Sequence, residues 1–325
     1  MAEKDWIYPA IALTLGLALA ALVVTPDPAG MLPNLVILPS WMLASAVVGS
    51  VYALLRMMAL GVKSPIAEFV RVVREDRKWL LGTVLLVGLA GANMMAFLWF
   101  KPLLNALVPF RADPFLARAD NLLFFGHDPY VFLTWLDFPG AELVYHKVWT
   151  AMMILTLLVI ATRPPSPDKS AVMLGYFVLW SLVGPAIHTL MPAVGPIFYA
   201  RMGYGDQFAG LVPGVETRAM ADYLWAVYDA KLFGAGSGIS AMPSLHVATA
   251  SWMAIAFWVL ARRYFAPIAA LSFLIFLMSI ALGWHYALDG LVGGASAVLV
   301  HLALRAWFRA RAQREAQAEG VAVAG

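Results

Sequence analysis

The sequence contains no cysteine, and only 13% of its 325 residues are charged. Without cysteine the chain has no disulfide, no thiolate metal ligand and no thiol nucleophile. A soluble globular protein carries about 25% charged and about 45–50% apolar residues, whereas 62% of this sequence is hydrophobic. The shortage of charge therefore excludes an ordinary soluble fold. The formal net charge of +3 is too small to indicate a nucleic-acid partner.

Long uncharged segments recur along the chain. Such continuous runs are typical of membrane-spanning helices, because about 20 apolar residues cross a bilayer. A β-barrel would instead need alternating segments of about ten residues. We therefore predict an all-α fold, a polytopic transmembrane helical bundle of about eight spans. The expected spans are Ile7–Val24, Leu35–Leu55, Trp79–Phe100, Val148–Ala161, Ala171–Leu190, Leu245–Leu260, Ala266–Leu282 and Tyr286–Trp307.

The basic residues predict the orientation of these spans. If the N-terminus is cytoplasmic, 15 of the 22 Lys and Arg residues lie on the cytoplasmic side, as the positive-inside rule requires. Both termini are then expected in the cytoplasm. The first span is expected to remain uncleaved, because Glu3 and Asp5 offset Lys4 in the short segment before it. The segment Gly61–Lys78 has the apolar and basic faces of a cytoplasmic interfacial helix, for which Ser64 is the expected N-cap.

Six histidines stand out, because ionisable side chains at membrane depth are costly and are functional candidates by default. His188 and His301 lie in apolar spans, where a hydrogen bond between helices is the favoured interpretation. His127 and His146 fall in the external stretch Lys101–Lys147 and are expected to be solvated. The other two histidines, each at the external start of a span, are the candidates for chemistry.

His246 ends the segment Ser240–His246, which places Pro243 and Ser244 at the predicted start of a span. Proline and serine both favour a helix start, so an N-cap at Ser244 is one interpretation. The other is an anion site, because the free backbone N–H groups of a helix N-terminus bind phosphate. His246 would then lie in the first turn, beside the anion.

His285 begins the last span, and Asp289 follows four residues later. On a helix the two side chains share a face, and a carboxylate behind an imidazole fixes its tautomer and raises its basicity. A purely structural His–Asp pair explains the spacing equally well. A metal site is less favoured, because no further histidine or carboxylate lies near either motif, and we expect no metal or other cofactor.

Two histidines and an aspartate on one side of a membrane suit phosphoryl transfer. His285, oriented by Asp289, would attack phosphorus and form a phosphohistidine. His246 would protonate the leaving oxygen. The helix start at Ser244 and a nearby cation would hold the phosphate oxygens. Water or an alcohol would then attack the intermediate.

Two motifs, Pro243–His246 and His285–Asp289, together resemble the paired signature of the type 2 phosphatidic acid phosphatase superfamily. The leucine before the first histidine and the His-Tyr pair look most like the branch that contains the inositol phosphorylceramide synthases. Two further stretches, Asp120–Pro129 and Pro192–Pro196 before Tyr199, are similar to that branch. The resemblance covers roughly residues 120–294.

The resemblance implies a metal-independent enzyme whose site lies at the external end of a helical membrane core. His285 is the implied nucleophile, Asp289 its partner and His246 the acid and base. The implied activity moves a phosphorylated headgroup from a phospholipid donor to an alcohol acceptor, as an inositolphosphotransferase does in sphingolipid metabolism. The alternative is a lipid phosphate or prenyl diphosphate phosphatase with the same three residues. Residues 101–308 would form this core, after N-terminal membrane helices in 1–100 and before a basic cytoplasmic tail in 309–325.

The sequence also departs from the superfamily pattern. The usual phosphate-binding Lys, followed seven positions later by Arg-Pro, is absent, as is the Arg that usually precedes the second histidine motif. The phosphate therefore needs another cation, for which Arg201 is the first choice, ahead of Lys231 and Arg218. Two other classes of function stay open, a transporter that uses His285 and Asp289 as a proton relay and a catalytically inactive scaffold.

Overall fold

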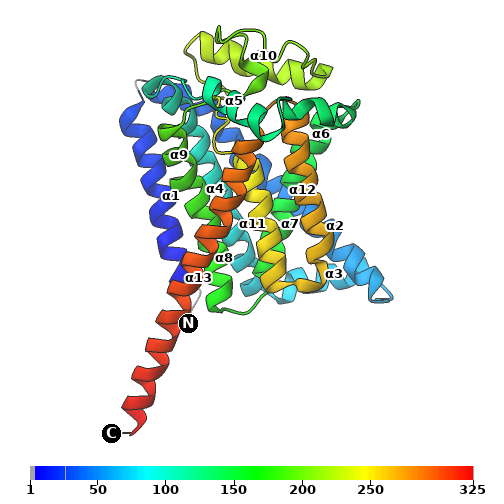
Figure 1. Ribbon diagram of the computed structural model, residues 1–325. Helices are drawn as coiled ribbons and strands as arrows, with labels where there is room; N and C mark the ends of the chain where they lie inside the picture. The colour runs from blue at the N-terminus through cyan, green and yellow to red at the C-terminus, as the bar shows by residue number, and fades with distance from the viewer. Residues whose placement is uncertain (1–3, 26, 325) are drawn as a thin grey trace.

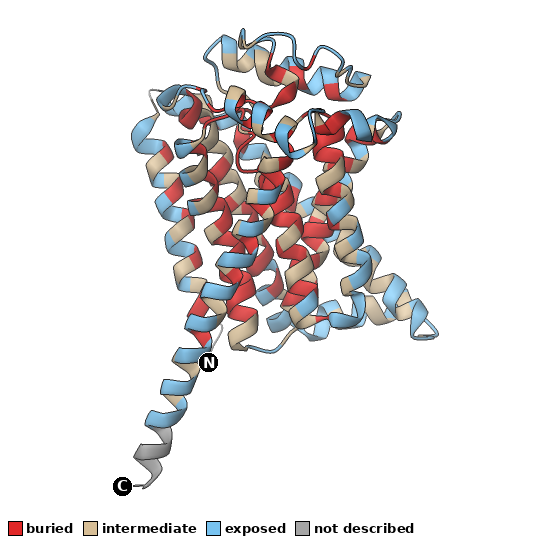
Figure 2. Cartoon of the chain, in the orientation of Figure 1, coloured by how far each residue is buried: buried red, intermediate tan, exposed pale blue. Residues whose placement is uncertain are grey.

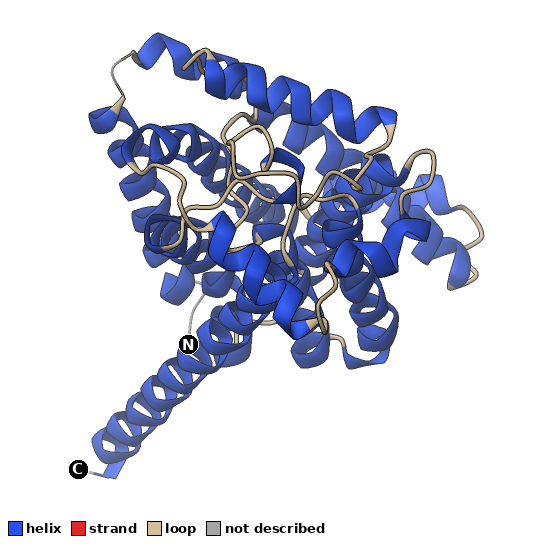
Figure 3. Cartoon of the chain, turned by 45° about the horizontal axis from the view of Figure 1, so that its top comes forward, coloured by secondary structure: helices blue, strands red, loops and turns tan. Residues whose placement is uncertain are grey.

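A computed structural model describes the backbone of residues 4–25 and 27–324, and among these residues there is no β-strand (Figures 1 and 3). The α-helices are α1 (Lys4–Val24), α2 (Ile37–Ala59), α3 (Pro65–Glu75), α4 (Arg77–Leu107), α5 (Asp113–Leu123), α6 (Ala141–Leu143), α7 (Trp149–Ala161), α8 (Pro167–Val178), α9 (Gly184–Leu190), α10 (Val215–Asp229), α11 (Leu245–Leu260), α12 (Phe265–Ala281) and α13 (Ala287–Ala324). Shorter 3₁₀ or π-helical pieces are η1 (Pro28–Val36), η2 (Pro129–Leu136), η3 (Val144–Val148), η4 (Leu179–Val183), η5 (Pro196–Phe198) and η6 (Arg262–Tyr264).

The predicted membrane architecture is confirmed. Seven helical stretches of the described chain are long and apolar enough to cross a bilayer. The remaining predicted span coincides with α11, which is equally apolar but has only 16 residues and is therefore about 24 Å long. The chain is thus an all-helical, multi-pass membrane protein.

Helix α11 lies in the middle of the bundle, where it packs against α7, α8, α12 and α13 (Figure 2). Its sequence is apolar on every side, as a helix surrounded by other helices requires. α13 approaches the start of α11 so closely that a Cβ on Gly293 would lie 2.5 Å from the carbonyl oxygen of Ser244. Glycine at this position therefore lets α11, which carries His246, and α13, which begins just after His285, meet at one end.

Helix α4 continues past the predicted end of its span at Phe100 and stops at Leu107. The sequence predicts that the span ends at Phe100 for two reasons. Lys101 is charged, and a residue before a proline disfavours the helical conformation. The expected segment boundary at residue 100 consequently falls inside a helix. Lys101, assigned to an external loop from the sequence, lies instead within the bundle.

The predicted interfacial helix is present as α3, whose apolar face is largely exposed, with Ile66 72% accessible. Ser64 occupies the N-cap position, but its side chain makes no capping hydrogen bond. The helix start depends instead on Pro65, whose fixed φ suits the first turn.

The described part of the expected C-terminal tail is helical, because α13 continues to Ala324 (Figure 1). Arg309 pairs with Asp168 at the start of α8, and Arg311 pairs with Asp5 in α1. Arg309 and Arg311 therefore connect the beginning of this segment to α8 and α1.

A buried amide connects three helical segments inside the bundle. Nδ2 of Asn93 in α4 donates to Oγ1 of Thr14 in α1 at 3.1 Å and to Oγ of Ser181 in η4 at 2.7 Å. Asn93 is completely buried. In an apolar environment such a side chain is stable only when it finds partners on neighbouring helices.

We expect Asn93→Ala to lower the free energy of unfolding by about 1 kcal/mol, because the substitution removes both interhelical hydrogen bonds. Ser181→Ala should cost less, and the double variant should lose less than the sum of the two. Reversible unfolding of the three variants in mixed micelles measures this coupling. Strictly additive losses would show that the Asn93–Ser181 bond contributes nothing.

Candidate active site

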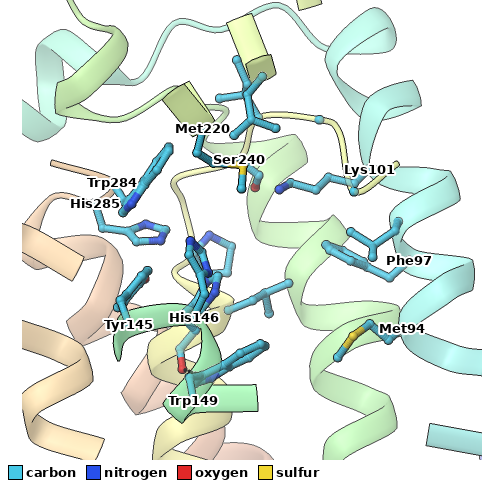
Figure 4. A pocket seen from close by; sticks show the side chains of 18 of the residues that line it. Met94, Phe97, Lys101, Tyr145, His146, Trp149, Met220, Ser240, Trp284 and His285 are labelled. Carbon is cyan, nitrogen blue, oxygen red and sulfur yellow. Dashed lines mark hydrogen bonds between the residues drawn. The ribbon is translucent and has the colours of Figure 1, made fainter. Parts of the chain in front are cut away.

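A cavity of about 270 Å³ lies at the end of the bundle where α11 and α13 begin (Figure 4). Its walls come from α4, from the stretch between α6 and α7, from the start of α11 and from the loop before α11. Helix α10 crosses this end of the bundle and contributes Met220 and Leu224 (Figures 1 and 3). Both His246 and His285 line the cavity, so the two motifs that are far apart in sequence do meet.

His285 is buried, and its ring is held by the loop before α11. Nδ1 of His285 lies 2.8 Å from the carbonyl oxygen of Ala241. A carbonyl oxygen can only accept a hydrogen bond, so Nδ1 carries the proton. Nε2 is then the unprotonated nitrogen of the neutral ring. Asp289 lies behind the same nitrogen, with Oδ2 3.5 Å from Nδ1.

Asp289 is therefore close to His285, but a backbone carbonyl makes the shorter contact. Oδ2 of Asp289 accepts a hydrogen bond from the backbone N–H of Tyr286 at 2.9 Å. Asp289 is the third residue of α13, so this is half of a capping box that fixes the helix start. The position of Asp289 is thus compatible with both interpretations of the pair: it caps α13, and it lies close enough to His285 to orient the ring.

A second carboxylate completes the cap of α13. Asp120 in α5 accepts hydrogen bonds from the backbone N–H groups of Ala287 at 2.5 Å and Leu288 at 3.0 Å. The first amides of α13 are consequently occupied by protein carboxylates. Of the two helix starts at the cavity, α11 is the one left to bind an anion.

Ser244 caps α11 as the sequence predicts. Its Oγ accepts a hydrogen bond from the backbone N–H of Val247 at 3.3 Å, and the residue is fully buried. The amides of Leu245 and His246 belong to the first helical turn, which has no intrahelical acceptor for them. Because both residues line the cavity, an anion inside it lies near these amides and the positive end of the helix dipole.

His246 is enclosed by aromatic rings. Its ring centroid is 4.3 Å from that of Trp149, 4.9 Å from that of Tyr145 and 6.4 Å from that of His285. Its backbone carbonyl also accepts a hydrogen bond from Nε1 of Trp149 at 3.1 Å. The imidazole thus has little freedom to turn away from the cavity.

Sequence reasoning missed the pair formed by Glu142 and His146. Nε2 of His146 lies 2.6 Å from Oε1 of Glu142, and the His146 ring is 5.1 Å from that of His246. Glu142 also accepts hydrogen bonds from Thr217 in α10 and Trp284. The expectation that His146 is simply solvated was wrong. Its spacing of four from a carboxylate, equal to that between His285 and Asp289, is the signal that points to it.

Lys101 is the one Lys or Arg among the residues that line the cavity. Its side chain reaches from α4 toward Ser240 (Figure 4). Arg201, the cation favoured from the sequence, is absent from the cavity lining; it forms an ion pair with Asp222 and packs over the rings of Phe198 and Trp225. Arg218 and Lys231, its alternatives, are exposed outside the cavity as well.

The loop 192–196 packs beneath the cavity through Asp113. This buried carboxylate accepts hydrogen bonds from the backbone N–H groups of Val194 and Gly195 and from the hydroxyl of Tyr286. Gly195 has a φ of +96°, and a Cβ there would lie 2.4 Å from the carbonyl oxygen of Trp284. Asp113 therefore connects the loop 192–196, one of the two stretches singled out beside the histidine motifs, to the His-Tyr pair of the second motif.

The other histidines lie outside this arrangement. His188 is buried with Nδ1 2.9 Å from Oγ of Ser240, so it bonds to the loop before α11 rather than to another helix. His127 is exposed on the surface, and His301 is buried in α13. In the described part of the chain, no group of three or more His, Asp or Glu side chains is arranged to hold a metal ion.

A family model described as the PAP2 superfamily matches residues 115–303, more than half of the chain. No match was found among curated proteins or among solved structures. The matched range begins in α5 and ends in α13. It therefore includes His246, His285 and Asp289.

Burial raises the pKa of both Asp113 and Asp120 from 3.8 to about 6, although hydrogen bonds from backbone N–H groups lower it. The folded chain thus binds more protons than the unfolded chain between about pH 4 and pH 6. The free energy of unfolding should fall as the pH rises through this window. We expect Asp120→Asn to reduce the fall in thermal midpoint between pH 4 and pH 6. Equal slopes for this variant and the wild type would contradict the assignment.

Proposed function

The chain belongs to the PAP2 superfamily, and from this membership and its histidine geometry we propose that it is a membrane lipid phosphotransferase. It moves a phosphorylated headgroup from a phospholipid donor to an alcohol acceptor, as the inositol phosphorylceramide synthases do. Members of the superfamily are generally metal-independent phosphatases or phosphotransferases. One observation carries the proposal: the Ala241 carbonyl occupies Nδ1 of His285 and leaves Nε2 as the nitrogen able to attack.

In the first step, Nε2 of His285 attacks the phosphorus of the donor. A bond forms between nitrogen and phosphorus, and the bond from phosphorus to the diacylglycerol oxygen breaks. The attack places positive charge on the imidazole, and the Asp289 carboxylate 3.5 Å from Nδ1 stabilises it. Protonated His246 gives its proton to the leaving oxygen.

In the second step, the alcohol hydroxyl attacks the phosphohistidine. His246, now neutral, accepts the hydroxyl proton as the new oxygen–phosphorus bond forms and the bond to Nε2 breaks. The neutral histidine and the protonated His246 are both regenerated. The rings around His246 keep it facing the cavity in both steps.

We assign the phosphate-binding role to Lys101 and to the first amides of α11. Lys101 supplies a full positive charge from the opposite wall, and the α11 N-terminus supplies hydrogen-bond donors and a favourable dipole. Together they replace the basic motifs that the sequence lacks. Phosphoryl transfer depends on such stabilisation, because charge spreads over the phosphate oxygens as bonds change.

Glu142 and His146 act as positioning residues for His246. The short contact between them and the donors from Thr217 and Trp284 fix the His146 ring beside that of His246. A fixed neighbour limits the motion of the acid and base. Because Thr217 belongs to α10, the same contacts also hold this helix over the cavity.

The composition of the cavity favours an alcohol over water as the acceptor. Its lining is dominated by apolar and aromatic side chains, among them Phe97, Trp149, Trp180, Phe198 and Trp284. A wall of this kind binds the apolar part of a lipid and admits few ordered waters. A phosphohistidine formed there survives until an acceptor hydroxyl arrives.

We place the histidine end of the bundle on the external side of the membrane and both termini in the cytoplasm. Five arginines lie toward the opposite end of the bundle: Arg56 in α2, Arg163 after α7, Arg262 and Arg263 in η6, and Arg305 in α13. By the positive-inside rule, that basic end faces the cytoplasm.

The proposal is tested with pure protein and a phospholipid labelled with ³²P in its phosphate, with and without a panel of lipid and polyol alcohols. We expect the label to move to an alcohol. His285→Ala should lower turnover about 10³-fold or more, whereas His127→Ala, an exposed histidine outside the cavity, should behave like the wild type. Transfer of the label only to water under both conditions, as the phosphorylated headgroup or as free phosphate, would contradict a transferase and favour the phosphatase. Unchanged lipid turnover in His285→Ala would contradict both.

The cation assignment is tested by a pair of variants. Lys101→Met should lower kcat/KM about 10²-fold, as loss of one group that stabilises the developing charge does. Arg201→Met, which removes the same charge outside the cavity, should retain nearly full activity. The opposite ranking would return the role to Arg201.

A further inference from the structure

A second polar cavity, of about 510 Å³, lies at the end of the bundle opposite the histidines. Four arginines line it: Arg56 of α2, Arg163 after α7, and Arg262 and Arg263 of η6. We call these four residues and the space between them the arginine cavity. α11, about 24 Å long, separates it from His246, so it is not part of the candidate active site.

These arginines have no carboxylate partner among the described residues. The acidic side chains at this end are engaged elsewhere: Glu68 and Glu75 with Arg71, and Asp168 with Arg305 and Arg309. Nε of Arg163 is buried and has no hydrogen-bond partner. A buried donor without an acceptor is costly, and the four guanidinium groups together leave a positive charge that an anion in the cavity would neutralise.

Two of the guanidinium groups are held in place by aromatic rings. The guanidinium carbon of Arg262 lies 3.7 Å from the centroid of the Trp258 ring, and that of Arg263 lies 4.5 Å from the Tyr264 ring. Stacking occupies the faces of the guanidinium groups and leaves the N–H donors at their edges free. Those donors match phosphate oxygens in geometry and charge.

An apolar groove of about 500 Å³ adjoins the arginine cavity and shares Tyr52, Arg56 and Thr162 with it. The groove runs between α2, α3 and α4, and its walls include Phe69, Trp79 and other apolar side chains. A cationic cavity that adjoins an apolar groove at the end of a membrane bundle is complementary to a phospholipid. The cavity suits the phosphate headgroup, and the groove suits the acyl chains.

We propose that the arginine cavity binds the phosphate of an anionic phospholipid from the adjacent leaflet, and that its acyl chains lie in the groove beneath α3. The lipid neutralises the clustered arginines. It also fills the space between α3 and the rest of the bundle. This site is independent of the proposed catalytic reaction.

The test uses the full-length protein in nanodiscs of phosphatidylcholine that contain phosphatidylglycerol, followed by native mass spectrometry of the lipids that stay bound. Wild type should retain phosphatidylglycerol in preference to phosphatidylcholine. Arg163→Gln/Arg262→Gln should retain about tenfold less, because each arginine near the membrane surface contributes to binding. Arg309→Gln/Arg314→Gln, which removes the same charge from α13, should retain as much as the wild type.

A second variant probes the groove without changing charge. Ala53→Trp fills part of the groove and should also reduce retention of phosphatidylglycerol. This variant and the lipid preference of the wild type keep the test decisive if the double arginine variant does not fold. Equal retention by the double arginine variant, or of the two lipids by the wild type, would overturn the proposal. Binding of inorganic phosphate by a protein that retains no phosphatidylglycerol would show that the cavity binds a free anion instead, which also overturns it.

Discussion

The geometry of the candidate site depends on three buried carboxylates that fix the first turn of α13. Asp289 binds the amide of Tyr286, Asp120 binds the next two amides, and Asp113 ties the Tyr286 hydroxyl to the loop 192–196. A helix start without such acceptors would leave its amides unpaired inside the protein. Because the turn cannot shift, His285 stays where Nδ1 meets the carbonyl of Ala241. The orientation of the proposed nucleophile thus follows from helix capping.

Much of this arrangement could be predicted from the sequence, because apolar runs and helix-start residues are local signals. The eight apolar segments and the N-cap at Ser244 are present where those signals place them. Lys101 was misplaced, because a charge followed by proline normally marks the end of a helix. The spacing of four between Glu142 and His146 does signal their pairing, but the position of the His146 ring beside His246 depends on how η3 packs against α11, which no local spacing reveals. Contacts between segments that are far apart in the chain therefore could not be predicted from the sequence.

Because only 13% of the residues are charged, the place and partner of each charged side chain help to locate the two proposed binding sites. At the histidine end, Asp113 and Asp120 are buried and accept hydrogen bonds from backbone amides, and Lys101 is the cation that faces the cavity. At the opposite end, the carboxylates pair with arginines of α3 and α13, and four other arginines stay without a carboxylate. Both ends thus hold a positive space suited to a phosphate, one beside histidines and one beside an apolar groove. The proposed catalytic and lipid-binding roles follow from this difference in surroundings.

The central claim is that Nε2 of His285 forms the bond to phosphorus. The most direct test is NMR of the phosphoenzyme formed from donor lipid without acceptor, with ¹⁵N in the histidine rings. Coupling of ³¹P to the ring nitrogens identifies which one is phosphorylated. The account predicts a single phosphohistidine, at Nε2 of His285, because Nδ1 is held by the Ala241 carbonyl. Phosphorus on Nδ1, or on another residue, would contradict it.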